Sequence, residues 1–168
     1  LNFNLREPLD PRLREALYLS GDRDALAAQI VGRGERPAWT MVPEGTRMGD
    51  TSYRGLALEV AALDLERRIE RARELVVDIK SLPMVQIDYA SNDENRVVAA
   101  ALQQMWQTAL PGLEVKLNNQ EFRVVLSQAR AGEFPGLVRS SWIADYNDPQ
   151  QFLELFRGGA PGNTSGFA

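Results

Sequence analysis

The fold of this protein is best deduced from the stretch Leu137-Val138-Arg139-Ser140-Ser141-Trp142-Ile143-Ala144-Asp145-Tyr146-Asn147-Asp148-Pro149. Its first part is apolar at positions that a pleated sheet can bury, which predicts a strand over residues 137–144. Its second part predicts a polar turn and then a helix, because Asp148 suits the N-cap, Pro149 the first helical position and Gln151 a capping box. The stretch therefore predicts a buried strand that runs through a loop into a helix.

Trp142, Asp145 and Tyr146 lie between the start of this strand and the helix. In open α/β sheets, ligands bind at the carboxyl ends of the strands, so these residues would place an aromatic surface and a carboxylate at a ligand cleft. Residue chemistry alone favours a simpler interpretation. In that interpretation Asp145 and Asn147 form the turn and Trp142 belongs to the core.

Upstream of residue 137 the chain alternates between strand and helix patterns. Apolar residues at every second position predict strands over 85–89 and 113–117, with a helix between them. Another helix separates the second strand from the strand at 137. This β-α-β-α-β succession predicts an α/β fold in which helices flank a mainly parallel, doubly wound sheet.

Capping residues predict where these two helices begin and end. We expect the first to begin at a capping box formed by Ser91 and Glu94. The second is expected to begin at Asn118 or Asn119 and to end at Gly132.

The amino-terminal part of the chain predicts a strand over residues 1–5 and two helices. Asp10 caps the first helix, and the second begins at Asp22 and ends near Gly32.

Prolines and glycines in residues 36–63 predict an irregular crossing segment, which Trp39 anchors to the core. A helix over residues 64–80 follows, with one apolar stripe. Its charged residues, Arg68 among them, are of mixed sign and predict a solvated face rather than a nucleic-acid surface.

Composition limits the class of protein. The 168 residues are 44% hydrophobic and 25% charged, which is typical of one globular domain with a core. The net charge of −4 does not favour a nucleic-acid partner or an anionic membrane surface. No apolar run is long enough to span a bilayer.

The chain contains neither histidine nor cysteine. It therefore cannot build a Ser-His-Asp or Cys-His nucleophile or an ordinary zinc site. An enzyme that uses carboxylates would need two of them opposed across a cleft, and only Asp145 can be assigned to one. We expect no catalytic residues, no metal and no cofactor.

Residues 142–149, Trp-Ile-Ala-Asp-Tyr-Asn-Asp-Pro, resemble the W-x-A-D-Y-x-D/E-P signature of extracellular solute-binding proteins of family 5, whose best-known members are periplasmic oligopeptide-binding proteins. Residues 14–26 resemble the family's R-x-A-L…D-R-x-x-L segment. Residues 119–122 resemble its N-Q-E-W, with Phe122 in place of Trp. The resemblance covers nearly the whole chain and is weakest over residues 44–63.

The resemblance implies a type II periplasmic-binding-protein-like fold. Members of the family are about three times longer, so residues 1–168 would be a single incomplete lobe of a larger two-lobed protein. Such a protein is the substrate-binding component of an ABC importer. Its two lobes close around a peptide ligand, and it docks on membrane permease subunits in the periplasm or, as a lipoprotein, on the extracellular face.

The resemblance also implies roles for charged and polar residues. Asp145 would pair with the ligand α-ammonium, and Arg139 and Arg130 would lie near the peptide's carboxylate. Surface or inter-lobe ion pairing is the alternative for both arginines. Asn95 falls where some oligopeptide binders have histidine, so the preferred ligand length stays open.

Apolar and aromatic residues complete the implied site. Trp142 and Phe122 would line pockets, although residue chemistry favours the core for Phe122. Ile143 and Ala144 would offer backbone groups to an extended ligand. Tyr146 would donate a hydrogen bond or hold the turn.

Other ligands and roles remain open. The same fold could bind a dipeptide, a murein peptide, an opine, a sugar or nickel, and Asp145 favours a ligand with an amine. A ligand-sensing domain of a regulator is another possibility, which a basic DNA-binding segment elsewhere in a longer chain would support.

Overall fold

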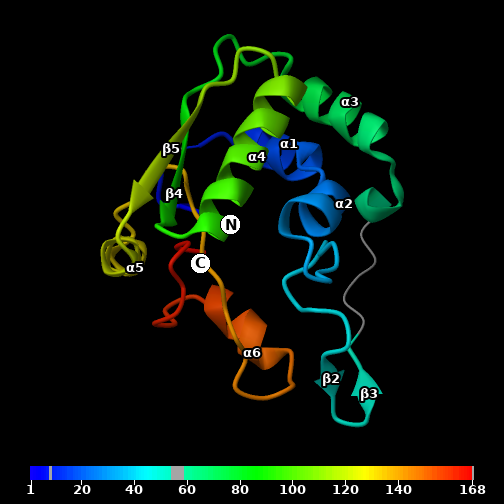
Figure 1. Ribbon diagram of the computed structural model, residues 1–168, viewed down its shortest axis with the longest axis vertical. Helices are drawn as coiled ribbons and strands as arrows, with labels where there is room; N and C mark the ends of the chain where they lie inside the picture. The colour runs from blue at the N-terminus through cyan, green and yellow to red at the C-terminus, as the bar shows by residue number, and fades with distance from the viewer. Residues whose placement is uncertain (8, 54–58, 168) are drawn as a thin grey trace.

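A four-stranded, mainly parallel sheet organises the protein (Figure 1). The computed structural model describes residues 1–7, 9–53 and 59–167. The strand order is β1-β6-β4-β5, and the strands are β1 (Asn2–Phe3), β4 (Val85–Ala90), β5 (Val115–Gln120) and β6 (Leu137–Val138). Strand β4 is central and parallel to both β5 and β6, whereas β1 runs antiparallel to β6. The predicted doubly wound α/β fold is confirmed.

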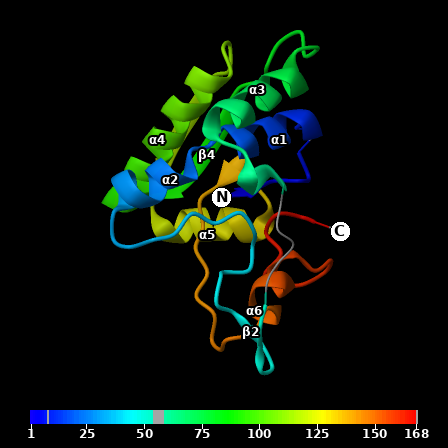
Figure 2. The ribbon, with the colours of Figure 1, turned by 90° about the vertical axis from the view of Figure 1, so that its right-hand side faces the viewer.

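Helices cover both faces of this sheet. Helices α1 (Pro11–Ser20), α3 (Leu65–Val76) and α4 (Asp93–Ala109) pack on one face, and α5 (Phe122–Ala131) on the other (Figure 2). The alternation along β4 explains the division. Val85, Ile87 and Tyr89 point into the larger core, whereas Ala90 joins the smaller cluster under α5.

The larger core is held by a buried tryptophan as well as by aliphatic residues. Trp106 of α4 is 3% exposed, and its indole N–H donates a hydrogen bond of 2.9 Å to the carbonyl of Leu17 near the end of α1. A buried indole needs such a partner. The bond therefore ties α4 to α1 while the ring fills the core.

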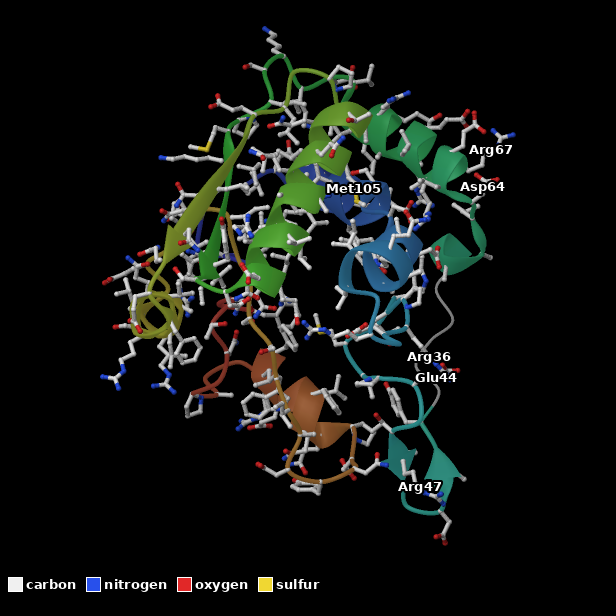
Figure 3. All side chains as sticks on the ribbon, viewed as in Figure 1. Arg36, Glu44, Arg47, Asp64, Arg67 and Met105 are labelled. Carbon is white, nitrogen blue, oxygen red and sulfur yellow. The ribbon has the colours of Figure 1, made fainter. Side chains whose placement is uncertain are left out.

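Side-chain caps begin most helices where the sequence predicts them. The carboxylates of Asp10, Asp22 and Asp64 each accept a backbone N–H at the start of a helix. Figure 3 labels Asp64 and Arg67 at the start of α3, where the N–H of Arg67 donates to Asp64 over 2.8 Å.

Two predicted caps are wrong. Asn92, not Ser91, caps α4 by accepting the N–H of Asn95, and Glu94 points to an arginine instead of completing a box. Glu121, not an asparagine, caps α5.

The predicted cap of α5 is wrong because β5 ends later than predicted, at Gln120 instead of residue 117. Strand β5 pairs residue by residue with β4 as far as Ala90 with Gln120, so Asn118 and Asn119 are strand residues.

Residues 36–53 are mostly irregular, as predicted, and residues 54–58 of the predicted irregular segment lie outside the described residues. The second predicted helix is α2 (Arg23–Ala25), which continues as the π-helix η1 (Leu26–Val31) and ends at Gly32 with φ of +66°. The short hairpin of β2 (Arg47–Met48) and β3 (Thr51–Ser52) follows, and then the 3₁₀ turn η2 (Glu59–Ala62).

Arginines anchor this segment to the helices. The guanidinium carbon of Arg23 lies 4.3 Å from the centre of the Trp39 ring, and that of Arg68 lies 4.6 Å from it. Arg68 is 2% exposed, so the prediction that it belongs to a solvated face is wrong. The cation–π contact explains its burial, and Tyr18 adds a hydrogen bond of 2.8 Å to the carbonyl of Trp39.

Strand β6 is much shorter than predicted. Pairing with β4 ends at Val138, and the chain over residues 139–148 is irregular. Ser140 and Ser141 interrupt the apolar run at this point, and Ser140 accepts a hydrogen bond from the Asn2 side chain over 3.0 Å. Residues that a longer strand would have buried therefore lie in a loop.

The entry into β6 requires glycine. Gly136 has φ of +87°, and a Cβ there would lie 2.7 Å from the carbonyl oxygen of Gln86. We expect Gly136→Ala to lower the free energy of unfolding by roughly 2–5 kcal/mol, the sum of left-handed strain and a clash with backbone. Chemical denaturation of the two proteins measures this difference.

Gly112→Ala is the matched control. Gly112 has a similar φ of +89°, and no described atom lies within 4 Å of its added Cβ. It should cost only about 1–2 kcal/mol, for the strain alone. Equal losses in the two variants would contradict the assigned clash.

Candidate ligand-binding site

The candidate site lies at the carboxyl ends of the parallel strands. Strands β4 and β5 end there, α4 and α5 begin there, and the loop over residues 139–149 leaves β6 on the same side (Figure 1). The open edge of a parallel α/β sheet is where ligands bind. The fold therefore gathers most of the predicted site residues at one edge of the sheet.

A buried carboxylate stabilises this edge. Asp88 of β4 is 2% exposed and accepts hydrogen bonds from the side-chain amides of Gln86, Asn118 and Gln120 over 2.5–3.1 Å. Gln120 also donates to Gln128 of α5. These amides solvate the charge in place of water. They also tie the end of β5 to β4 and to α5.

Arg139 is the first residue after β6 and is held by both its backbone and its side chain. Its N–H donates to the carbonyl of Asp88 over 2.8 Å, and its Nη2 pairs with Glu94 over 2.9 Å. The Arg139 side chain is 17% exposed. Arg139 is thus ion-paired, but the pair is mostly buried and lies within this domain, so it is neither the surface pairing nor the inter-lobe pairing expected as the alternative.

The stretch over residues 142–146 is exposed. Trp142 is 50%, Ile143 88% and Tyr146 53% exposed, so the interpretation of Trp142 as a core residue is wrong. Among the described residues, no hydrogen bond involves the backbone of Trp142, Ile143 or Ala144. This extended stretch therefore presents unpaired peptide groups beside two aromatic rings.

Asp145 presents its carboxylate to solvent. Its backbone N–H donates to the side chain of Gln151 over 2.9 Å, but its carboxylate has no hydrogen bond or ion pair with a described side chain. Gln151 is thus used by Asp145 and not by a capping box. The Asp148 carboxylate accepts the N–H of Gln150 over 2.8 Å, but the N-cap of α6 (Gln150–Leu153) is Pro149, so the helix begins one residue later than predicted.

The exposed loop also contacts the distant hairpin. Asn147 accepts the backbone N–H of Arg47 over 2.8 Å, and Figure 3 labels Arg47 on this hairpin. A cavity of about 290 Å³ lies here, lined by Pro43, Thr46, Ala144, Tyr146, Asn147 and Phe152. Tyr146 therefore borders a hollow on one side of the exposed stretch.

The remaining predicted site residues differ in their surroundings. Phe122 is 61% exposed at the start of α5, so its assignment to the core is wrong. Asn95 donates its side-chain amide to the carbonyl of Ala90 over 2.9 Å. Arg130 is exposed near the other end of α5, about 12 Å along the helix axis from Phe122.

Sequence reasoning missed Asp88, Glu94 and Arg33 as members of this edge. Asp88 looks like an ordinary polar residue of an alternating strand. Only Asn118 and Gln120 indicate that β5 is also polar on the side of the sheet to which Asp88 points. Glu94 fits a capping pattern, and this pattern does not indicate its ion pairs with Arg139 and Arg33.

Other kinds of site find no support. Over residues 1–7, 9–53 and 59–167, no group of three or more acidic side chains could hold a metal ion. No helix in those ranges has the length and apolarity needed to cross a membrane.

Comparison with known proteins identifies the family. Residues 1–164 match the family of bacterial extracellular solute-binding proteins, family 5 Middle. The chain belongs to this family.

Relatives within family 5 share both sequence and fold. The periplasmic murein peptide-binding protein MppA of Escherichia coli is 30% identical over 159 residues, which are 94% of this chain and 29% of that protein. The structure of OppA from Burkholderia pseudomallei superposes with a TM-score of 0.87 at 31% identity, covering 99% of this chain and 33% of that one. The structure of Escherichia coli MppA gives a TM-score of 0.84 at 28% identity, covering 99% and 33%. The chain thus spans about a third of the length of these family 5 relatives.

The buried carboxylate offers a test of how the edge of this family 5 domain is stabilised. Asp88→Asn would place an amide N–H₂ among amide donors, so we expect it to lower the free energy of unfolding by roughly 1–3 kcal/mol. Asp93→Asn is the control, because the Asp93 side chain is 95% exposed. Urea denaturation of both variants checks the difference, and equal stability would refute the role of Asp88.

Proposed function

We propose that residues 1–168 form one lobe of a larger two-lobed protein that binds oligopeptides for an ABC importer. The observation that carries the proposal is the exposed stretch over residues 142–146, in which unpaired peptide groups, two aromatic rings and an unpaired carboxylate are adjacent. A peptide ligand has a complementary group for each of them.

Each proposed contact follows from ligand chemistry. The α-ammonium of the peptide pairs with Asp145, and its backbone pairs with the peptide groups of Ile143 and Ala144. Trp142 and Tyr146 supply apolar surface for side chains, as aromatic residues do in many binding sites. The other predicted site residues lie farther from the stretch over residues 142–146. They are Phe122, Arg130, Arg139 and Asn95.

Relatives support this ligand class. Escherichia coli MppA is named as a murein peptide-binding protein, and an oligopeptide-binding protein of Haemophilus influenzae is 30% identical to this chain. Both names include the word periplasmic, which supports a periplasmic location for this protein or, for a lipoprotein, the extracellular face. The partners would be permease subunits of the importer and the other lobe.

The proposed activity is binding and not catalysis. One assigned carboxylate and the absence of histidine and cysteine from the sequence provide no nucleophile and base pair. An amine-bearing ligand is favoured over a sugar or nickel because the unpaired group at the site is a carboxylate. A sensing role in a regulator has no specific observation in its favour.

The role of Asp145 can be tested in the full-length protein that contains residues 1–168. Asp145→Asn keeps the shape but leaves the ligand ammonium without a counter-charge. We expect a loss of roughly 2–5 kcal/mol in binding free energy, on the order of 30- to several-thousand-fold in Kd. Calorimetry with a peptide that binds the unmodified protein measures it, and thermal unfolding should change little.

Asp148→Asn is the matched control in the same loop. The Asp148 carboxylate accepts the N–H of Gln150 in front of α6, and an asparagine oxygen can accept the same bond, so both stability and affinity should stay nearly unchanged. A loss of stability with unchanged affinity in Asp145→Asn would identify Asp145 as a turn residue. Peptides with an acetylated amine provide the complementary test, and they should bind the unmodified protein as weakly as free peptides bind Asp145→Asn.

The lobe division makes a separate prediction for residues 1–168 alone. Small-ligand sites bury most of the ligand surface, and this chain would supply only one wall. The charged groups that this one wall offers to a ligand stay exposed to water, where ion pairs contribute little. We expect calorimetry to give Kd values no better than roughly millimolar. Submicromolar binding by the monomeric chain would contradict the division into two lobes.

A further inference from the structure

A carboxylate and two guanidinium groups form a cluster at the edge of the sheet, beside the loop that carries Asp145. Glu94 lies in the first turn of α4, Arg139 follows β6, and Arg33 follows η1. One oxygen of Glu94 pairs with Nη2 of Arg139 over 2.9 Å, and the other pairs with Nη1 of Arg33 over 3.1 Å. Three separate elements thus meet at one carboxylate.

We propose that Glu94 is an internal counter-ion that determines specificity, because it occupies the position on Arg139 that the carboxylate of a short peptide would otherwise take. The inference rests on the proposed function, since it concerns the selection of peptides by the same site. It assigns a role to a residue that belongs to neither the family signature nor the predicted site.

The burial of the pair supports this role. The Arg139 side chain is 17% exposed, whereas that of Arg33 is 71% exposed. Pairs between exposed charges contribute little, but removing a partner from a mostly buried charge is costly. The contact between Glu94 and Arg139 is therefore the stronger of the two, and Arg33 mainly restrains the carboxylate.

The backbone fixes both partners before a ligand arrives. The N–H of Arg139 is bonded to the carbonyl of Asp88, and Glu94 lies at a helix N-terminus, where negative charge is favoured. The Nε of Arg139 is buried and has no hydrogen-bond partner among the described residues. Nη2 of Arg139 is already paired with Glu94, so a ligand carboxylate could make the two-pronged contact with this guanidinium only by displacing Glu94, and would otherwise meet an arginine whose charge Glu94 already balances.

The position of the pair relates this competition to ligand length. Arg139 and Asp145 are six residues apart, so their Cα atoms are separated by no more than about 20 Å. An extended peptide whose ammonium lies at Asp145 can bring its terminal carboxylate to Arg139 only if it has no more than about six residues, and such peptides are called short here. Longer peptides would carry their carboxylate past this point. With Glu94 paired to Arg139, short peptides gain nothing from their carboxylate, so the site does not favour them over longer ones.

The test compares pairs of peptides of two to eight residues that differ only in a free or an amidated carboxyl terminus. Their Kd values are measured by calorimetry with the full-length protein that contains residues 1–168. We expect the free acid and the amide to differ by less than about threefold for short peptides in the unmodified protein. In Glu94→Gln the short free acids should gain about tenfold or more over their amides, because Arg139 then lacks its counter-ion.

Asp93→Asn is the control variant. Asp93 is the neighbouring acid in the same first turn of α4, but its only described ion pair is with Arg96 at the surface. Asp93→Asn removes the same charge from the helix N-terminus without touching Arg139. The ratio of its Kd values for free acids and amides should therefore equal that of the unmodified protein. Glu94→Ala provides a second removal of the carboxylate if Glu94→Gln folds poorly.

The possible outcomes separate the two proposals. A strong preference of the unmodified protein for short free acids, left unchanged by Glu94→Gln and Glu94→Ala, would overturn the role of Glu94 while peptide binding stands. Equal gains in Asp93→Asn and Glu94→Gln would attribute the effect to the helix terminus and also overturn it. No binding of any peptide to any variant would overturn the proposed function, and the role of Glu94 with it.

Discussion

The parallel pairing of β4 with β5 on one side and with β6 on the other is the constraint on which the rest of the structure depends. Parallel neighbours must be joined by crossover connections, so α4 and α5 are forced onto opposite faces of the sheet. All three strands consequently end at the same edge. The loop after β6 and the first turns of both helices meet there because of strand direction, before any side chain contributes.

Charge is handled differently in the interior and at the edge of this sheet. Asp88 is buried among amides that donate to it, and Arg68 is buried against the ring of Trp39. Neither has an ion-pair partner of opposite charge among the described residues. At the edge, Glu94 and Arg139 neutralise each other, whereas the carboxylate of Asp145 stays unpaired. Hydrogen bonding is incomplete in the interior as well, because Nη1 of Arg68 and Nε of Arg139 are buried without a partner among the described residues.

Much of the fold could be predicted because its signals are local. Asp10, Asp22 and Asp64 cap helices through contacts within three residues, and strand alternation at Val85, Ile87 and Tyr89 is visible in the sequence alone. Trp142 and Asp145 could be proposed as site residues for the same reason, since they belong to one continuous signature, and their roles stay predictions.

The errors concern contacts between segments that are far apart in the sequence. Nothing near Glu94 shows that Arg139 lies beside it, and a serine three residues before a glutamate looks like a capping box in any context. The end of β6 at Val138 depends on where its pairing with β1 and β4 stops as well as on Ser140 and Ser141. Arg68 has the composition of a surface residue, and its burial depends on Trp39 from another segment.

The position of β1 has a consequence for how the chain folds during synthesis. Asn2 and Phe3 pair with Val138 and Leu137, and the amide of Asn4 is bonded to the carbonyls of Gly132 and Phe134. These partners leave the ribosome long after the first strand does. Strand β1 therefore stays unpaired during synthesis, with its backbone hydrogen-bonding groups open to other chains, until nearly all of the domain has been made. The polar Asn2 and Asn4 on either side of Phe3 make the unpaired strand less prone to aggregate.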